Sequence, residues 1–180
     1  MLNAFRFRLF QLACIALLSA ISTAAQQPAD SAAPVAPIPP AIYAAKTAFV
    51  SNAGADSGLF PHPFSGDPDR AYNQFYAALQ DWGRFQLVAA PDAADLVLEL
   101  RLFAPNGPAN ANKQKGASDP LPMLRLSVID RKTHYTLWAL TESIDPANLQ
   151  KTHDRNFDDA LNALTLDLKR LATKPPAPTP

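Results

Sequence analysis

One stretch, residues 93–104, constrains the fold more than any other part of this sequence. It reads AADLVLELRLFA, and its alternation places four leucines on one side: Leu96, Leu98, Leu100 and Leu102. A period of two residues is typical of a β-strand with one apolar face. Such a face has to be covered, and an amphipathic helix lies on each side of this stretch along the chain. We therefore predict the central strand of a small α/β domain.

The amino-terminal residues 1–25 have the pattern of a secretory signal peptide. Arg6 and Arg8 precede an apolar run, and small residues follow it up to Ala25. The apolar run has about 13 residues, whereas a membrane-spanning helix needs about 20. We therefore predict cleavage after Ala25 or one residue earlier, and no integral membrane span after cleavage.

The single cysteine limits both lipid attachment and chemistry. Cys14 lies inside the apolar run, and Gln11 stands three residues before it, where a lipoprotein signal normally has leucine. We therefore predict an exported protein, periplasmic or secreted, that is not lipidated. After cleavage the chain has no cysteine, hence no disulfide, no thiolate metal ligand and no cysteine nucleophile.

Two proline-rich segments flank the predicted domain. Residues 26–43 form a Pro/Ala-rich linker and residues 173–180 a disordered tail, because neither has a periodicity that could bury a face. Residues 44–172 remain as a single α/β domain. Removing the two arginines of the signal from 16 basic residues leaves 14 against 16 acidic ones. This balance does not favour nucleic acid as a partner.

Strand and helix patterns complete the domain. Further strands are predicted at residues 45–51, 84–88, 123–130 and 134–143, of which the last two form an antiparallel hairpin. One helix is predicted to start at Asp67 and Pro68 and to end at Gly83. The fold class is an α/β (α+β) two-layer sandwich, with a mixed sheet of about five strands and two helices on one face.

The second helix is predicted over residues 154–172. Asp158 and Asp159 are expected in its first turn, and Lys169 and Arg170 in its last turn. Negative charge at the start and positive charge at the end complement the helix dipole. The apolar stripe of this helix includes Leu164, which is expected in the core.

Three short motifs lie in the predicted strands of the domain. They are the Ala-Asp-Leu-Val-Leu-Glu of residues 94–99, the Val-Ile-Asp of residues 128–130, and Leu137-Trp138 in the next strand. Over about residues 45–172 the chain resembles the amino-terminal domain of the TolB family and the periplasmic domain of the curli-secretion (CsgG-like) family. The resemblance implies a non-enzymatic module that binds another envelope component.

No catalytic or metal motif is present in the sequence. His62, His134 and His153 are far apart and form no ligand pair at helical or strand spacing, so we predict no metal and no cofactor. Ser57 and Ser65 lie beside glycines, but neither stands in a known nucleophile motif. We therefore assign no catalytic residue.

The irregular segment 54–68 is the best candidate for contact with a partner. It is too long for a simple connection, and it holds Phe60 and Phe64 outside any amphipathic pattern. Together with His62 and the strand residue Trp138, they are the predicted partner-contact residues. The alternative is that both phenylalanines fold back and cap the edge of the core, since exposed aromatic side chains are uncommon.

The function favoured by these patterns is a non-enzymatic periplasmic or secreted binding or assembly module, with an envelope protein as partner. One alternative is a small hydrolase-like enzyme, which requires Asp56, Ser57 and His62 to converge in the 54–68 loop. The other is a purely structural envelope protein that binds no partner.

Overall fold

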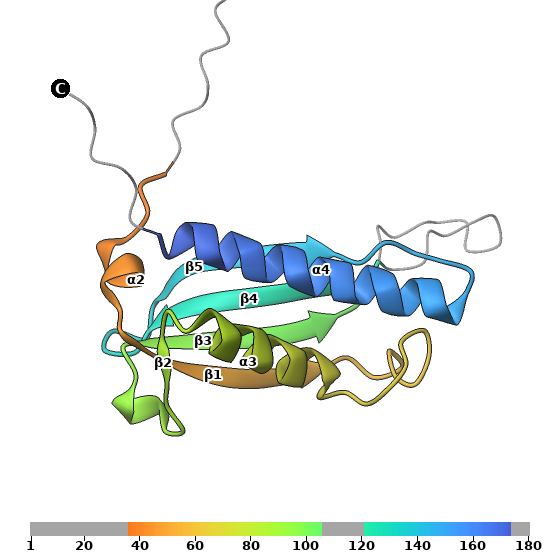
Figure 1. Ribbon diagram of the computed structural model, residues 1–180, viewed down its shortest axis with the longest axis horizontal. Coiled ribbons are helices and arrows are strands. Elements are labelled where there is room, and N and C mark those ends of the chain that lie inside the picture. The colour runs from red at the N-terminus through yellow and green to blue at the C-terminus, as the bar shows by residue number, and fades with distance from the viewer. Residues whose placement is uncertain (1–35, 106–120, 174–180) are drawn as a thin grey trace, which may run out of the picture. The chain divides into compact units, whose positions relative to one another are not determined.

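The computed structural model describes residues 36–105 and 121–173, and all elements below lie within them. In chain order these elements are α2 Pro40–Ala44, β1 Thr47–Ala55, α3 Arg70–Trp82, β2 Gln86–Leu87, the 3-10 turn η1 Pro91–Ala93, β3 Leu96–Phe103, β4 Met123–Asp130, β5 Thr136–Ser143 and α4 Gln150–Leu171 (Figure 1). Among these described helices, none is long and apolar enough to cross a membrane.

The five strands form one mixed sheet in the order β2-β1-β3-β4-β5. Strand β1 runs parallel to β2 and β3, whereas β3, β4 and β5 are successively antiparallel. Strand β3 is therefore the middle strand, as the leucine alternation predicts. The hairpin of β4 and β5 is also confirmed, and β4 has the predicted bounds.

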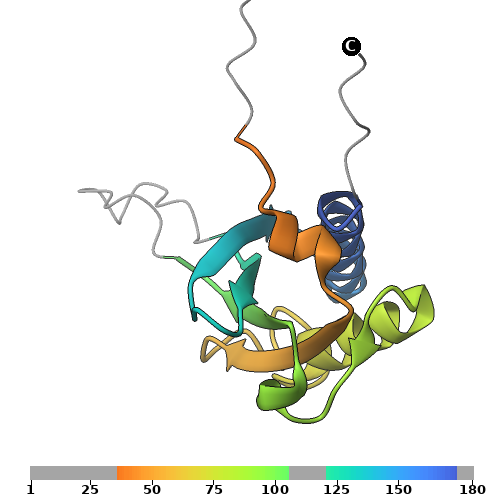
Figure 2. The ribbon, with the colours of Figure 1, turned by 90° about the vertical axis from the view of Figure 1, so that its left-hand side faces the viewer.

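Helices α3 and α4 lie side by side on one face of the sheet, which confirms the two-layer sandwich (Figures 1 and 2). The leucines of β3 point into this layer, and none is more than 2% exposed. Leu124, Leu126 and Val128 of β4 continue the same buried surface at 0%. From the helix side, Phe75, Phe157 and Leu164 close the core, each fully buried.

A third helix, α2, was not expected from the sequence. Four of its five residues lie in the 26–43 segment predicted as a linker, and its Ile42 is fully buried in the core. With five residues it spans little more than one turn, so no helical repeat can develop in the sequence. The folded domain therefore includes residues on the amino-terminal side of residue 44.

The predicted starts of the two long helices are both wrong. Helix α3 begins at Arg70 because the Asp67 carboxylate accepts the N–H of Asp69 at 2.9 Å, which forms a turn ahead of the helix. Its end at Gly83 is confirmed, with φ 63°. Helix α4 begins at Gln150, so Asp158 lies in its third turn and is not explained by the helix dipole.

Candidate functional site

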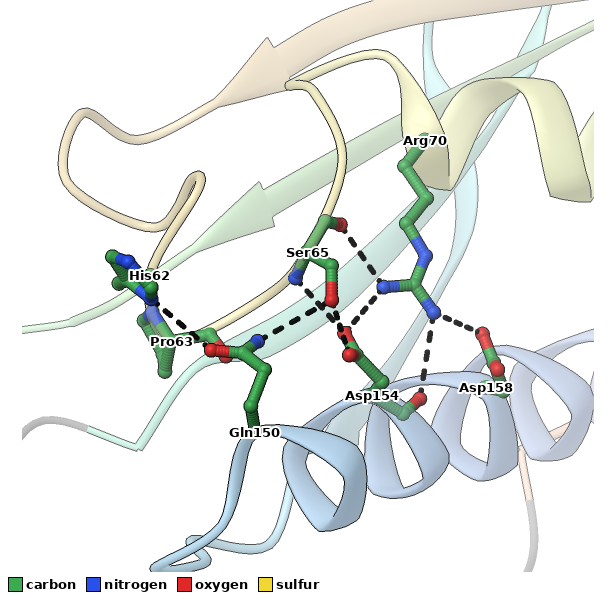
Figure 3. A network of polar contacts seen from close by, with 7 residues as sticks. All are labelled: His62, Pro63, Ser65, Arg70, Gln150, Asp154 and Asp158. Carbon is green, nitrogen blue, oxygen red and sulfur yellow. Dashed lines mark hydrogen bonds and ion pairs between the residues drawn. The ribbon is translucent and has the colours of Figure 1, made fainter.

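A network of hydrogen bonds and ion pairs joins the end of the irregular segment 54–68 and the first residue of α3 to the amino-terminal part of α4 (Figure 3). It consists of Ser65, Arg70, Asp154 and Asp158. The Asp154 carboxylate accepts the backbone N–H of Ser65 at 2.9 Å, the Ser65 hydroxyl, and Nη1 of Arg70 at 2.7 Å. Nη2 of Arg70 donates to Asp158 Oδ1 at 2.7 Å. One guanidinium thus joins two consecutive turns of α4.

The charge state of Asp154 follows from these contacts. The hydrogen bond from the Ser65 hydroxyl, and then the backbone and Arg70 contacts, hold the pKa of Asp154 well below its usual range, although burial acts in the opposite direction. A carboxylate with so low a pKa is a weak general base near neutral pH. The Arg70 guanidinium also lies 4.5 Å from the ring centre of Phe157. The geometry of this network is that of a structural contact between segments.

The residues that a hydrolase site in the 54–68 loop would require contact different parts of the fold. At the carboxyl end of β3, the Asp56 carboxylate accepts hydrogen bonds from Nη2 of Arg101 and from the N–H of Ala104, both at 3.0 Å. The hydrogen bond from Arg101, and then that from the Ala104 N–H, lower the pKa of Asp56. Nδ1 of His62 lies 3.1 Å from Oε1 of Gln150, at the start of α4. Ser57 is exposed.

Of the two loop phenylalanines, Phe64 belongs to the core and Phe60 packs against it, which agrees with the alternative considered above. Phe64 is 0% exposed, and its ring centre lies 5.2 Å from that of Phe157 on α4. Phe60 is partly buried, and its ring centre lies 6.0 Å from that of Phe64. The expectation that Phe64 contacts a partner is therefore wrong, because α4 supplies the apolar surface that covers its ring.

The aspartates of the short motifs at residues 94–99 and 128–130 join strand ends. Asp95 Oδ2 accepts the N–H groups of Lys46 and Thr47 at 2.8 and 3.0 Å, which joins the starts of β1 and β3. These contacts lower the pKa of Asp95. Asp130 Oδ1 accepts the N–H groups of the turn that follows β4. Both carboxylates also line a shallow pocket of about 320 Å³ beside α2.

Trp138 lies on β5, the outer strand of the sheet. It stands directly opposite Val128, so its side chain is on the helix-covered face, where it is partly buried against the core. Tyr135, which precedes the strand, is 74% exposed. Burial, and then the nearby Asp167 of α4, raise the pKa of Glu142 on the same face. That Trp138 contacts a partner stays a prediction. Tyr135 is not among the predicted contact residues, because it lies inside the strand predicted over residues 134–143, whereas β5 begins only at Thr136.

The backbone of β5 is bonded on one side only within the described part of the chain. The N–H of Ile144 donates to the carbonyl of Pro122 at 2.8 Å. Antiparallel strands alternate between bonded and non-bonded pairs, so the N–H and C=O of Leu140 point toward β4. Those of Ala139 and Thr141 point to the outer side, where the described residues place no further strand.

Among the described residues, no group of three or more His, Cys, Asp and Glu side chains could hold a metal ion. The prediction that the protein binds neither a metal nor a cofactor stays a prediction.

Comparison with known proteins gives distant structural likenesses. No family model matches the sequence, and neither does any curated protein. A PelC dodecamer subunit from Paraburkholderia phytofirmans has a TM-score of 0.43 at 14% identity, covering 72% of this chain and 89% of that one. A protein from Xanthomonas campestris of the family model DUF330 has a TM-score of 0.42 at 16% identity, covering 75% and 87%.

An uncharacterised lipoprotein B from Nitrosomonas europaea has a TM-score of 0.38 at 9% identity, covering 71% of this chain and 83% of that one. At TM-scores below 0.5, these likenesses carry no argument about function. The resemblance to the TolB amino-terminal domain and the curli-secretion family therefore stays a prediction that rests on the sequence motifs.

Proposed function

We propose that this chain is a non-enzymatic binding or assembly module of the bacterial envelope, exported to the periplasm or secreted, and that it binds through the outer edge of β5. The observation that supports this proposal is the outer backbone edge of β5, beside which residues 36–105 and 121–173 place no further strand. Exposed Tyr135 and partly exposed Trp138 accompany this edge. Aromatic side chains of this kind are enriched in protein interfaces.

The polar side chains near the 54–68 loop support the non-enzymatic part of the proposal. Asp154 is held ionised by Ser65 and Arg70, and His62 contacts Gln150. A nucleophilic serine requires a base of suitable pKa within hydrogen-bond reach. The contacts of Ser65 include a carboxylate of very low pKa and an amide, neither of which meets that requirement.

Site-specific photocrosslinking tests the binding surface. A photoreactive phenylalanine analogue replaces Trp138 in the full-length chain, expressed in its own host. The matched control carries the analogue at Leu166 of α4, which is 52% exposed. We expect a discrete crosslinked product from position 138 and none from position 166. The absence of a product at 138, or equal products at both positions, would contradict the proposal.

Export is tested by sequencing the amino terminus of the protein purified from its host. The proposal expects a start at Gln26 or one residue earlier. A start at a lipid-modified Cys14 would contradict the prediction that the protein is not lipidated, and it would leave the proposed role of β5 intact.

A further inference from the structure

The two edges of the sheet differ in how they are protected against pairing with another strand. Natural sheets protect an exposed edge by keeping its strand short or by placing proline or lysine on it. Strand β2, at one edge, has two residues. Strand β5, at the other edge, has eight residues, TLWALTES, without proline, glycine or lysine. The β5 edge is therefore suited to accept a further strand.

The terminal segments of this chain are poor candidates for that strand. Residues 26–43 contain five prolines and residues 173–180 contain four. Each proline lacks the backbone N–H that a ladder requires. A second copy of β5 has a backbone N–H at each position and the same outward-facing groups. The pairing would be isologous, as in most two-fold dimers.

We propose that β5 pairs antiparallel with β5 of a second copy, about a two-fold axis at Ala139, so that the two sheets become one. Ala139 then stands opposite itself, and its outward N–H and C=O complete a bonded pair. Trp138 of each copy stands opposite Leu140 of the other, on the helix-covered face. The partly exposed apolar side chains on this face therefore meet each other.

The charges of β5 agree with this register. Its only charged residue is Glu142, which stands opposite Thr136 of the second copy. The two Glu142 residues lie six positions apart along the paired strands, or about 20 Å at about 3.3 Å per residue. A shift of the axis to Leu140 would instead place Trp138 opposite Glu142, whose carboxyl is already near Asp167. The axis at Ala139 is therefore preferred.

This inference rests on the proposed function, since both place the contact at β5. It is tested with single cysteines in the full-length chain, because Cys14 is the only native cysteine and can be removed as Cys14→Ser. Ala139→Cys places two thiols directly opposite each other across the axis. Thr141→Cys is the matched control. It is also exposed and on the same face, but its two copies lie about 13 Å apart at about 3.3 Å per residue.

We expect oxidation or a short bis-maleimide to convert Ala139→Cys to a covalent dimer, and Thr141→Cys to at least about tenfold less dimer under the same conditions. The melting temperatures of both variants are expected to match the parent. Equal crosslinking at the two positions, or none at Ala139→Cys, would overturn the inference.

A charge exchange at the axis gives an independent readout. Ala139→Lys alone and Ala139→Glu alone place like charges opposite each other, so each is expected to sediment as a monomer. A mixture of the two variants is expected to form the dimer again. A mixture that stays monomeric would overturn the inference.

Failure of the inference can be told apart from failure of the proposed function. A negative result in both dimer tests, combined with a product at Trp138 that contains a different protein, would refute the second copy and leave the proposed function standing. Absence of any product at Trp138 would refute both.

Discussion

The 54–68 loop and the region of strand β5 each carry an aromatic side chain, Phe64 and Tyr135, and the fold places these two in opposite environments. In the loop, Phe64 is covered by Phe157, and the Asp154 carboxylate is bonded to Ser65 and Arg70. Just before β5, Tyr135 is exposed, and the pairing of β5 with β4 directs the backbone N–H and C=O of Ala139 outward. In an irregular segment, the aromatic rings and polar groups can thus find their partners within the domain. A regular strand, by contrast, can leave backbone N–H and C=O groups available to a partner.

The largest expected effect on this comparison comes from the loop core. Phe64→Ala is expected to lower the free energy of unfolding by about 3–5 kcal/mol, because it removes a fully buried ring and leaves a cavity against Phe157. Urea unfolding measures the change. A loss below about 1 kcal/mol would show that the loop does not belong to the core.

The middle strand provides a reference for that value. Leu98→Ala is expected to cost about 2–5 kcal/mol, since Leu98 is 0% exposed beneath the helices. The same urea measurement applies. If Phe64→Ala costs far less than Leu98→Ala, the loop is only loosely attached to the sheet and helices.

The polar network is expected to contribute less than the core. Arg70→Met keeps much of the apolar stem but removes the donors to Asp154 and Asp158, and we expect a loss of about 1–3 kcal/mol in urea unfolding. Arg170→Met is the matched control, because its ion pair with Asp167 lies on the surface and its side chain is 79% exposed. Equal losses in the two variants would contradict a special role of the network.

The pH dependence of stability gives a smaller and more selective effect. The pKa of Asp154 is lower in the folded than in the unfolded chain, where it is about 3.9. Its contribution is therefore complete above that pH and is lost as the pH falls below it. Ser65→Ala removes the hydroxyl hydrogen bond that lowers the pKa of Asp154 most. The stability of this variant should therefore fall less steeply below about pH 4. Parallel curves for the variant and the parent would contradict the assignment.

The smallest expected effect is at the β5 edge. Tyr135→Ser should change the free energy of unfolding by less than about 0.5 kcal/mol, because the side chain is mostly in solvent. Urea unfolding at low protein concentration is the measurement. A loss above about 1 kcal/mol would mean that Tyr135 packs within the domain.

Local patterns predict those parts of the fold that depend on nearby residues. Strand β4 and the middle position of β3 follow from alternating leucines, and the end of α3 follows from Gly83. The start of α4 was missed because Gln150, Lys151, Thr152 and His153 contribute no apolar residue to the stripe. That error also assigned Asp158 to the wrong turn.

The site depends on contacts that no local pattern contains. Ser65 and Asp154 are 89 residues apart, so their hydrogen bond exists only after α4 has packed beside the loop. The exposure of β5 is likewise a property of the strand order, which places it outside β4. The sequence shows that residues 136–143 favour a strand, but not that this strand forms an edge.

Amide hydrogen exchange across β5, measured residue by residue at low and high protein concentration, tests the open edge most directly. The amides of Leu140 and Glu142 point toward β4 and should exchange slowly at both concentrations. Those of Ala139 and Thr141 should exchange rapidly in dilute protein and become protected at high concentration. If they exchange at the same rate at every concentration, whether fast or slow, the account of β5 as an open edge that pairs with a second copy is contradicted.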